Sequence, residues 1–126
     1  MRPLHINRVG LALLGVLLVA AGCNQSATPP APLPVEQIPS ALQKAFSKAK
    51  PEVKDFANLI VSSVQAQDYS KAYLELQKLS SAPGLRQEQS SIAIRCTVTL
   101  GALLQSAEAK GDEKAAETLK VYRSTK

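Results

Sequence analysis

The positions of proline set the strongest limits on how this chain can fold. Five of its eight prolines fall between residues 24 and 39, and after residue 40 only Pro51 and Pro83 occur. Each proline fixes φ, lacks a backbone N–H donor and pushes the preceding residue toward an extended conformation. We therefore expect residues 24–39 to contain no helix or strand and to act as a semi-rigid spacer.

The region after this spacer, residues 40–126, is rich in Ala, Leu, Gln, Lys, Glu and Ser, most of which favour helix. Ser40 and Gln43 fit a capping box for a first helix that continues to about Ala49. Pro51 suits the first turn of a second helix, whose apolar residues recur at helical spacing as Val53, Phe56, Ala57, Ile60 and Val64. Further helices are expected over 69–81 and 86–110, with breaks at Asp68, Pro83-Gly84 and Gly111-Asp112. Asp112 is expected to cap a last short helix whose inward residues are Ala115, Ala116, Leu119 and Tyr122. The fold class is all-α, a small antiparallel bundle of helical hairpins.

The helix expected from Arg86 to Lys110 is the longest. One side carries Ile92, Cys96, Leu100, Leu103 and Ala107. Because Ile94 and Val98 add apolar surface on another side, we expect this helix to be the central and most enclosed one.

Two turn regions of the helical part resemble each other. The stretches 66–72 and 109–115 each contain an Ala, an Asp and a Lys-Ala pair, and their first residues lie 43 positions apart. This pattern resembles the turn of tetratricopeptide-type hairpins, and Phe56, Leu59, Ala72 and Leu76 fall near hydrophobic positions of that motif. The spacing differs from the 34 residues of that repeat family, so two hairpins selected for simple packing remain an alternative.

The N-terminal residues have the order of an export signal. Arg2 and Arg8 precede an apolar run, 9–21, which is shorter than the ~20 residues of a membrane-spanning helix. Val19-Ala20-Ala21-Gly22-Cys23 then resembles the lipobox of bacterial lipoproteins, although Ala20 stands where that family most often has Leu. The resemblance implies a cleaved signal at 1–22, a lipid-anchored linker at 23–39 and a helical domain at 40–126.

In that family the cysteine, here Cys23, carries the lipid, so the resemblance implies acylation there with labelling by palmitate. It also implies export and membrane attachment in the cell envelope. Asn24 after the cysteine favours the outer membrane over the inner membrane by the enteric sorting rule.

Side chains that support catalysis are scarce in the part of the chain that follows the signal. The only histidine, His5, belongs to the signal, so triads and histidine-ligated metal sites are not expected. Cys96 lies in an apolar stripe and is expected to be structural. Ser47 and Lys50 match Ser-x-x-Lys, but the chain lacks the other motifs and the length of serine β-lactamases. We expect no enzyme activity and no cofactor.

Charge also limits the possible partners. Without Arg2 and Arg8 the chain keeps 13 basic and 10 acidic residues, which are interleaved. Nucleic-acid binding is not expected, because it requires clustered cations and stacking aromatics.

The sequence thus predicts a non-enzymatic interaction module that binds an unidentified envelope protein. The alternative is a structural or self-associating envelope lipoprotein. An exposed apolar groove would favour the first, and a continuous apolar seam along one long helix would favour the second. The charged residues expected at the rim of an interface are Lys71, Glu75, Lys78, Arg86, Glu88 and Arg95.

Overall fold

A computed structural model of the chain describes residues 30–125. It contains a short 3-10 helix, η2 (Val35–Gln37), followed by five α-helices and no strand in this range. The helices are α1 (Ile38–Ala45), α2 (Pro51–Gln65), α3 (Tyr69–Ser80), α4 (Gln87–Ala109) and α5 (Glu113–Ser124). The expected all-α fold is confirmed.

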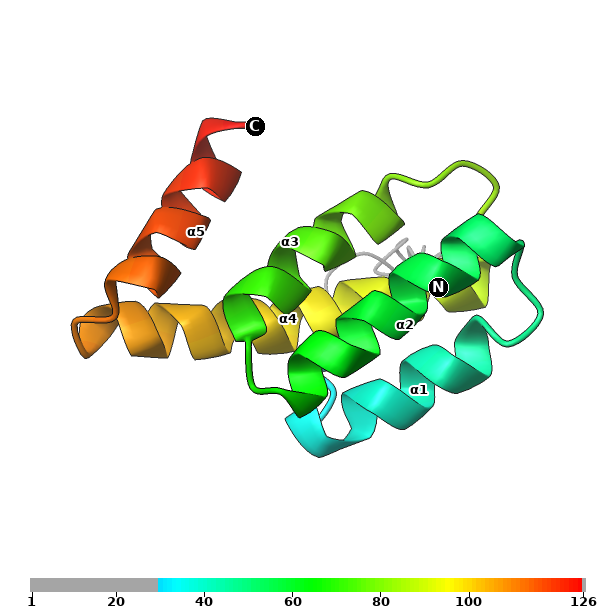
Figure 1. Cartoon of the computed structure of the whole chain (residues 1–126), viewed down its shortest axis with the longest axis horizontal. Helices are drawn as coiled ribbons and strands as arrows, with labels where there is room; N and C mark the ends of the chain where they lie inside the picture. Colours follow the sequence, from blue (N-terminus) through cyan, green and yellow to red (C-terminus); the bar gives the residue numbers. More distant parts are fainter. Residues whose placement is uncertain (1–29, 126) are drawn as a thin grey trace, which may run out of the picture.

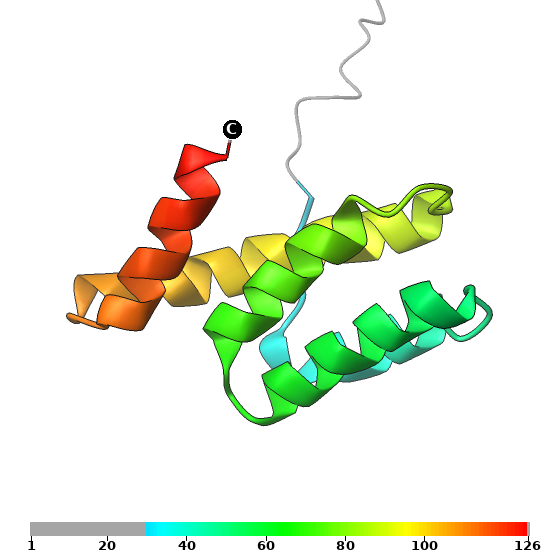
Figure 2. The same cartoon turned by 45° about the horizontal axis from the view of Figure 1, so that its top comes forward.

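Helices α1 to α4 form the body of the molecule (Figure 1). Helix α2 packs on α1 and α3, and α4 packs on both α3 and α1, so that the four helices enclose one core. Its largest fully buried side chains are Phe46, Ile38, Leu42, Ile60, Leu76, Leu79 and Leu100. Helix α4 extends beyond this body, and α5 turns back from its end and points away from α3 at an angle (Figures 1 and 2).

The two polar turns begin their helices as expected. The carboxylate of Asp68 accepts a hydrogen bond from the backbone N–H of Lys71, and that of Asp112 accepts one from Ala115. Both turns also contain a left-handed residue, Gln67 at φ 58° and Gly111 at φ 91°.

The backbone hydrogen bonds of the two turns are equivalent. Asp68 N–H donates to the carbonyl of Ser63, and Asp112 N–H donates to that of Ala107. The turns therefore superimpose with a spacing of 44 residues, from Asp68 to Asp112, and not the 43 residues given by the Lys-Ala pairs.

The structure corrects the expected start of the helical domain. Helix α1 begins at Ile38, and Ser40 lies inside it, where its hydroxyl donates to the carbonyl of Gln37 instead of capping the helix. Pro39 is tolerated because the first turn of a helix needs no N–H from that residue. The helix also ends at Ala45, earlier than the expected Ala49.

The end of the proline-rich stretch is therefore part of the core. Leu33 and Ile38 are both buried. The Arg95 Nε–H donates to the carbonyl of Ala31 (2.9 Å), and the Thr99 hydroxyl donates to the carbonyl of Leu33. The boundary expected at residue 40 lies too late, because apolar residues of the supposed spacer pack on α1 and α4.

Helix α4 is central but not enclosed on every side. Ile94 and Val98, expected to be covered, are 49% and 39% exposed. The neighbouring helices α1, α3 and α5 contact other sides of α4, so this side has no covering helix in the described part of the chain. Leu59, one of the tetratricopeptide-like positions, is also exposed, at 46%.

Candidate protein-binding groove

The first residues of α3 and α5 are joined by an ion pair. The Nζ of Lys114 lies 2.9 Å from Oδ1 of Asp68, the residue that caps α3. This hydrogen bond is the main reason why the pKa of Asp68 is lowered, and the N–H of Lys71 contributes further. The pair joins the starts of α3 and α5, from which the two helices diverge (Figures 1 and 2).

Two tyrosines connect α3 and α5 farther along. The rings of Tyr73 and Tyr122 meet edge to face, with centroids 5.5 Å apart and an interplanar angle of 81°. Such pairs add about 0.5–1.5 kcal/mol beyond the burial of their area. Tyr73 is buried, and this burial raises the pKa of its hydroxyl to about 12. The pair is therefore a second contact between α3 and α5.

Beyond the tyrosine pair the helices separate and leave an open hollow of about 500 Å³. We call it the α3–α5 groove; its lining residues are Leu74, Gln77, Ser81, Val121, Tyr122 and Thr125. Leu74 is 37% exposed and Val121 is 47% exposed, so aliphatic surface from both helices faces solvent here. Burial of that surface under a partner would be favourable by about 25 cal/mol per Å².

One polar group of the α3–α5 groove lacks a hydrogen bond. The side-chain nitrogen of Gln77 is shielded from solvent and has no partner among the described residues. A buried amide without a partner costs roughly 1–3 kcal/mol. Because this nitrogen is covered, a ligand would pair with it only after the Gln77 side chain turns toward the groove.

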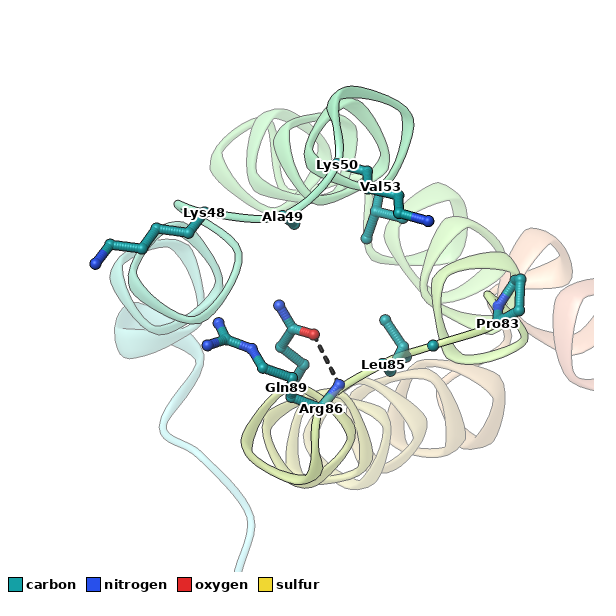
Figure 3. Close-up of a pocket in the computed structure, with 9 residues that line it drawn as sticks. Lys48, Ala49, Lys50, Val53, Pro83, Leu85, Arg86 and Gln89 are labelled. Atoms are coloured by element: carbon teal, nitrogen blue, oxygen red, sulfur yellow. Dashed lines mark hydrogen bonds between the residues drawn. The ribbon is translucent and has the colours of Figure 1, made fainter.

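A second hollow, of about 190 Å³, lies at the end of the bundle where α1 stops and α4 starts (Figure 3). Basic residues Lys48, Lys50 and Arg86 stand around it, but the side chain of Lys48 extends away from its centre. Gln89 points into it and is fully paired: its amide donates to the carbonyl of Ala45 (3.1 Å) and accepts from the N–H of Arg86 (2.9 Å). Gln89 thus links α1 to α4, and we interpret the hollow as a packing junction.

The charged residues expected to form one interface rim are distributed over different places. Arg86 lines the hollow at the bundle end, and Arg95 holds Ala31. Glu75 and Lys78 pair with each other along α3 at 3.2 Å. The structure therefore does not bring these charges together into one rim.

The two cysteines differ in what the structure shows of them. Cys96 is fully buried, and this burial raises the pKa of its thiol to about 12. The predicted lipid attachment site, Cys23, lies outside the described residues, as does the whole predicted signal.

The residues of the α3–α5 groove were not identified from the sequence. Val121 and Leu74 neighbour Tyr122 and Tyr73 in the chain, and both had no expected role. Their exposure depends on the angle at which α5 leaves α4, which hydrophobic periodicity does not encode. The available signal was a tyrosine beside each aliphatic residue, Tyr73 before Leu74 and Tyr122 after Val121.

No protein-family model, curated protein or solved structure matches this chain. Within residues 30–125, no helix has the length and apolar character needed to cross a membrane. The same range contains no group of His, Cys, Asp and Glu side chains arranged to hold a metal ion.

Proposed function

We propose that this protein is a lipid-anchored protein of the bacterial cell envelope that binds another protein in the α3–α5 groove and catalyses no reaction. The observation that carries the proposal is the exposed aliphatic surface of Leu74 and Val121. These residues lie on two helices that an ion pair joins at their starts. A pre-organised apolar site loses little entropy on binding.

The groove suits an amphipathic helix or an apolar peptide segment. Aliphatic side chains of such a segment would pack between Leu74 and Val121, as in helix-in-groove recognition. Once the Gln77 side chain turns toward the groove, a carbonyl of the segment would accept a hydrogen bond from its amide. The hydroxyls of Ser81 and Thr125 at the open end provide further polar contacts.

The structural alternative requires a continuous apolar seam along one long helix. The exposed side of α4 offers only two large aliphatic residues, Ile94 and Val98. Polar residues Ser91 and Gln105 stand where a seam would continue. We therefore favour partner binding in the α3–α5 groove over self-association through the exposed side of α4.

The test of binding is a pull-down from envelope membranes with the double variant Leu74→Glu/Val121→Glu. The wild-type protein should retain a reproducible partner that the double variant loses, while helicity and melting temperature stay nearly unchanged. The matched control is Leu59→Glu, which places the same charge on an exposed leucine of α2. Equal capture by the double variant and the wild type would refute the assignment of the groove.

The anchor is tested separately. Labelled palmitate should enter the wild-type chain and should not enter Cys23→Ser. Equal labelling of both would refute acylation at Cys23.

A further inference from the structure

The solvent-exposed face of α4 carries no charged side chain between Glu88, which is exposed at the start of the helix, and Glu108 near its end. The exposed residues in this range are Ser91, Ile94, Val98, Ala102, Gln105 and Ser106. At 1.5 Å per residue this uncharged α4 face extends over about 23 Å. The solvent face of a helix normally carries charged and polar side chains. Here two exposed aliphatic side chains, Ile94 and Val98, lie at the middle of the face with only uncharged polar or small residues around them, so this face is less polar than a typical solvent face.

The described part of the chain begins beside this face. Residues 30–34 cross the side of α4 that is turned away from α3 (Figure 2). The Arg95 side chain donates a hydrogen bond to the carbonyl of Ala31, and the Thr99 hydroxyl donates one to the carbonyl of Leu33. Since Arg95 follows Ile94 directly on the helix, Ala31 is fixed next to the exposed aliphatic pair.

The distance from Ala31 to the predicted anchor is short. Ala31 lies eight positions after Cys23. A chain of that length spans at most about 29 Å when fully extended. If Cys23 is acylated, as proposed above, the membrane surface lies within that distance of the uncharged α4 face. The packing of residues 31–39 on α4 shortens the spacer by about half.

We propose that the uncharged α4 face, centred on Ile94 and Val98, rests on the lipid surface in which Cys23 is anchored. The two aliphatic side chains enter the boundary between headgroups and acyl chains. Arg95 is the only charged residue from 89 to 107 and stands at the edge of this face, where its guanidinium meets headgroup phosphates. Helix α3 lies on the other side of α4, so the α3–α5 groove stays open to a protein partner (Figure 1).

The experiment uses the full acylated chain in vesicles of phosphatidylethanolamine and phosphatidylglycerol. Single variants Ile94→Cys and Val98→Cys are each labelled with an environment-sensitive fluorophore, and Leu59→Cys on α2 is the matched control. Native Cys96 is fully buried and stays unlabelled in the folded protein. Circular dichroism checks that each labelled variant keeps its helicity.

The labels at positions 94 and 98 should shift their emission to shorter wavelength on reconstitution and should be quenched by nitroxide lipids. The label at position 59 should show neither effect. Equal behaviour at all three positions overturns the inference. Energy transfer between labels on two copies at position 94, without quenching by lipid, also overturns it and assigns the face to a second copy of the chain.

Mass spectrometry of the purified protein separates this inference from the proposed anchor. An acylated Cys23 without lipid contact at position 94 overturns the orientation alone. A chain that is not acylated overturns the anchor and the orientation together.

Discussion

Removal of the residues before Ser40 tests whether the proline-rich stretch belongs to the folded domain. A chain that starts at residue 40 lacks Leu33 and Ile38, which are both buried, and it lacks the first two residues of α1. Burial of one such aliphatic side chain contributes about 1.5–3 kcal/mol. The truncation should therefore cost about 3–6 kcal/mol. A domain of this size has about 5–15 kcal/mol in total.

The measurement is thermal and urea unfolding, followed by circular dichroism, for chains that start at residue 30 and at residue 40. The shorter chain should melt at least ~12 °C lower, since 1 kcal/mol shifts the melting temperature of such a domain by about 4–8 °C. Within the longer chain, Leu33→Ala should cost about 2 kcal/mol or more. Leu59→Ala, at an exposed leucine, should stay within roughly 1 kcal/mol. Equal stability of the two chains would refute the packing of residues 31–39 on the core.

Three further changes test separate parts of the structure. Cys96 should react slowly with a thiol reagent at mildly alkaline pH, because its thiol is buried with a pKa of about 12. It should react rapidly once denaturant is added. Rapid reaction in the native state would contradict its burial. Asp68→Ala should cost about 1 kcal/mol at neutral pH through loss of the N-cap, whereas Asp55→Ala on the exposed side of α2 should cost less. Because folding lowers the pKa of Asp68, its carboxylate stabilises the fold at pH values above its ordinary pKa. The difference in the free energy of unfolding between the wild type and Asp68→Ala should therefore narrow as the pH falls below about 4. Urea unfolding at a series of pH values measures this difference. Gly101→Ala lies inside α4, where the new Cβ would make an ordinary 3.6 Å contact, and it should stabilise the fold by about 0.5–1 kcal/mol. Gly111→Ala, at φ 91°, should destabilise the fold by about 1 kcal/mol. If urea unfolding gives the same sign for both variants, the turn conformation at Gly111 is refuted.

Local signals in the sequence were sufficient to predict most of the helices. Pro51 begins a helix and Pro83 lies between two others, because the constraint on φ acts within one or two residues. Asp68 and Asp112 cap helices as expected, since a cap is made by a side chain and the N–H groups that follow it. These features depend on neighbours in the chain and not on the tertiary fold.

The errors arise where a residue depends on distant partners. Leu33 is buried in the core, and Thr99, 66 positions later in the chain, donates a hydrogen bond to its carbonyl. Ile94 and Val98 were expected to be covered, but hydrophobic character does not tell which side of a helix has a neighbour. The α3–α5 groove escaped prediction for the same reason, because it depends on the angle between two helices.

The central claim is that a protein partner occupies the α3–α5 groove, and site-specific photo-crosslinking in living cells tests it most directly. A photoreactive amino acid is placed at Val121 or Leu74 in the groove, and at Leu59 as the exposed control. After irradiation, the two groove positions should give the same cross-linked protein, identified by mass spectrometry, and position 59 should not. Cross-links only to a second copy of the chain, or the same products from all three positions, would contradict the account.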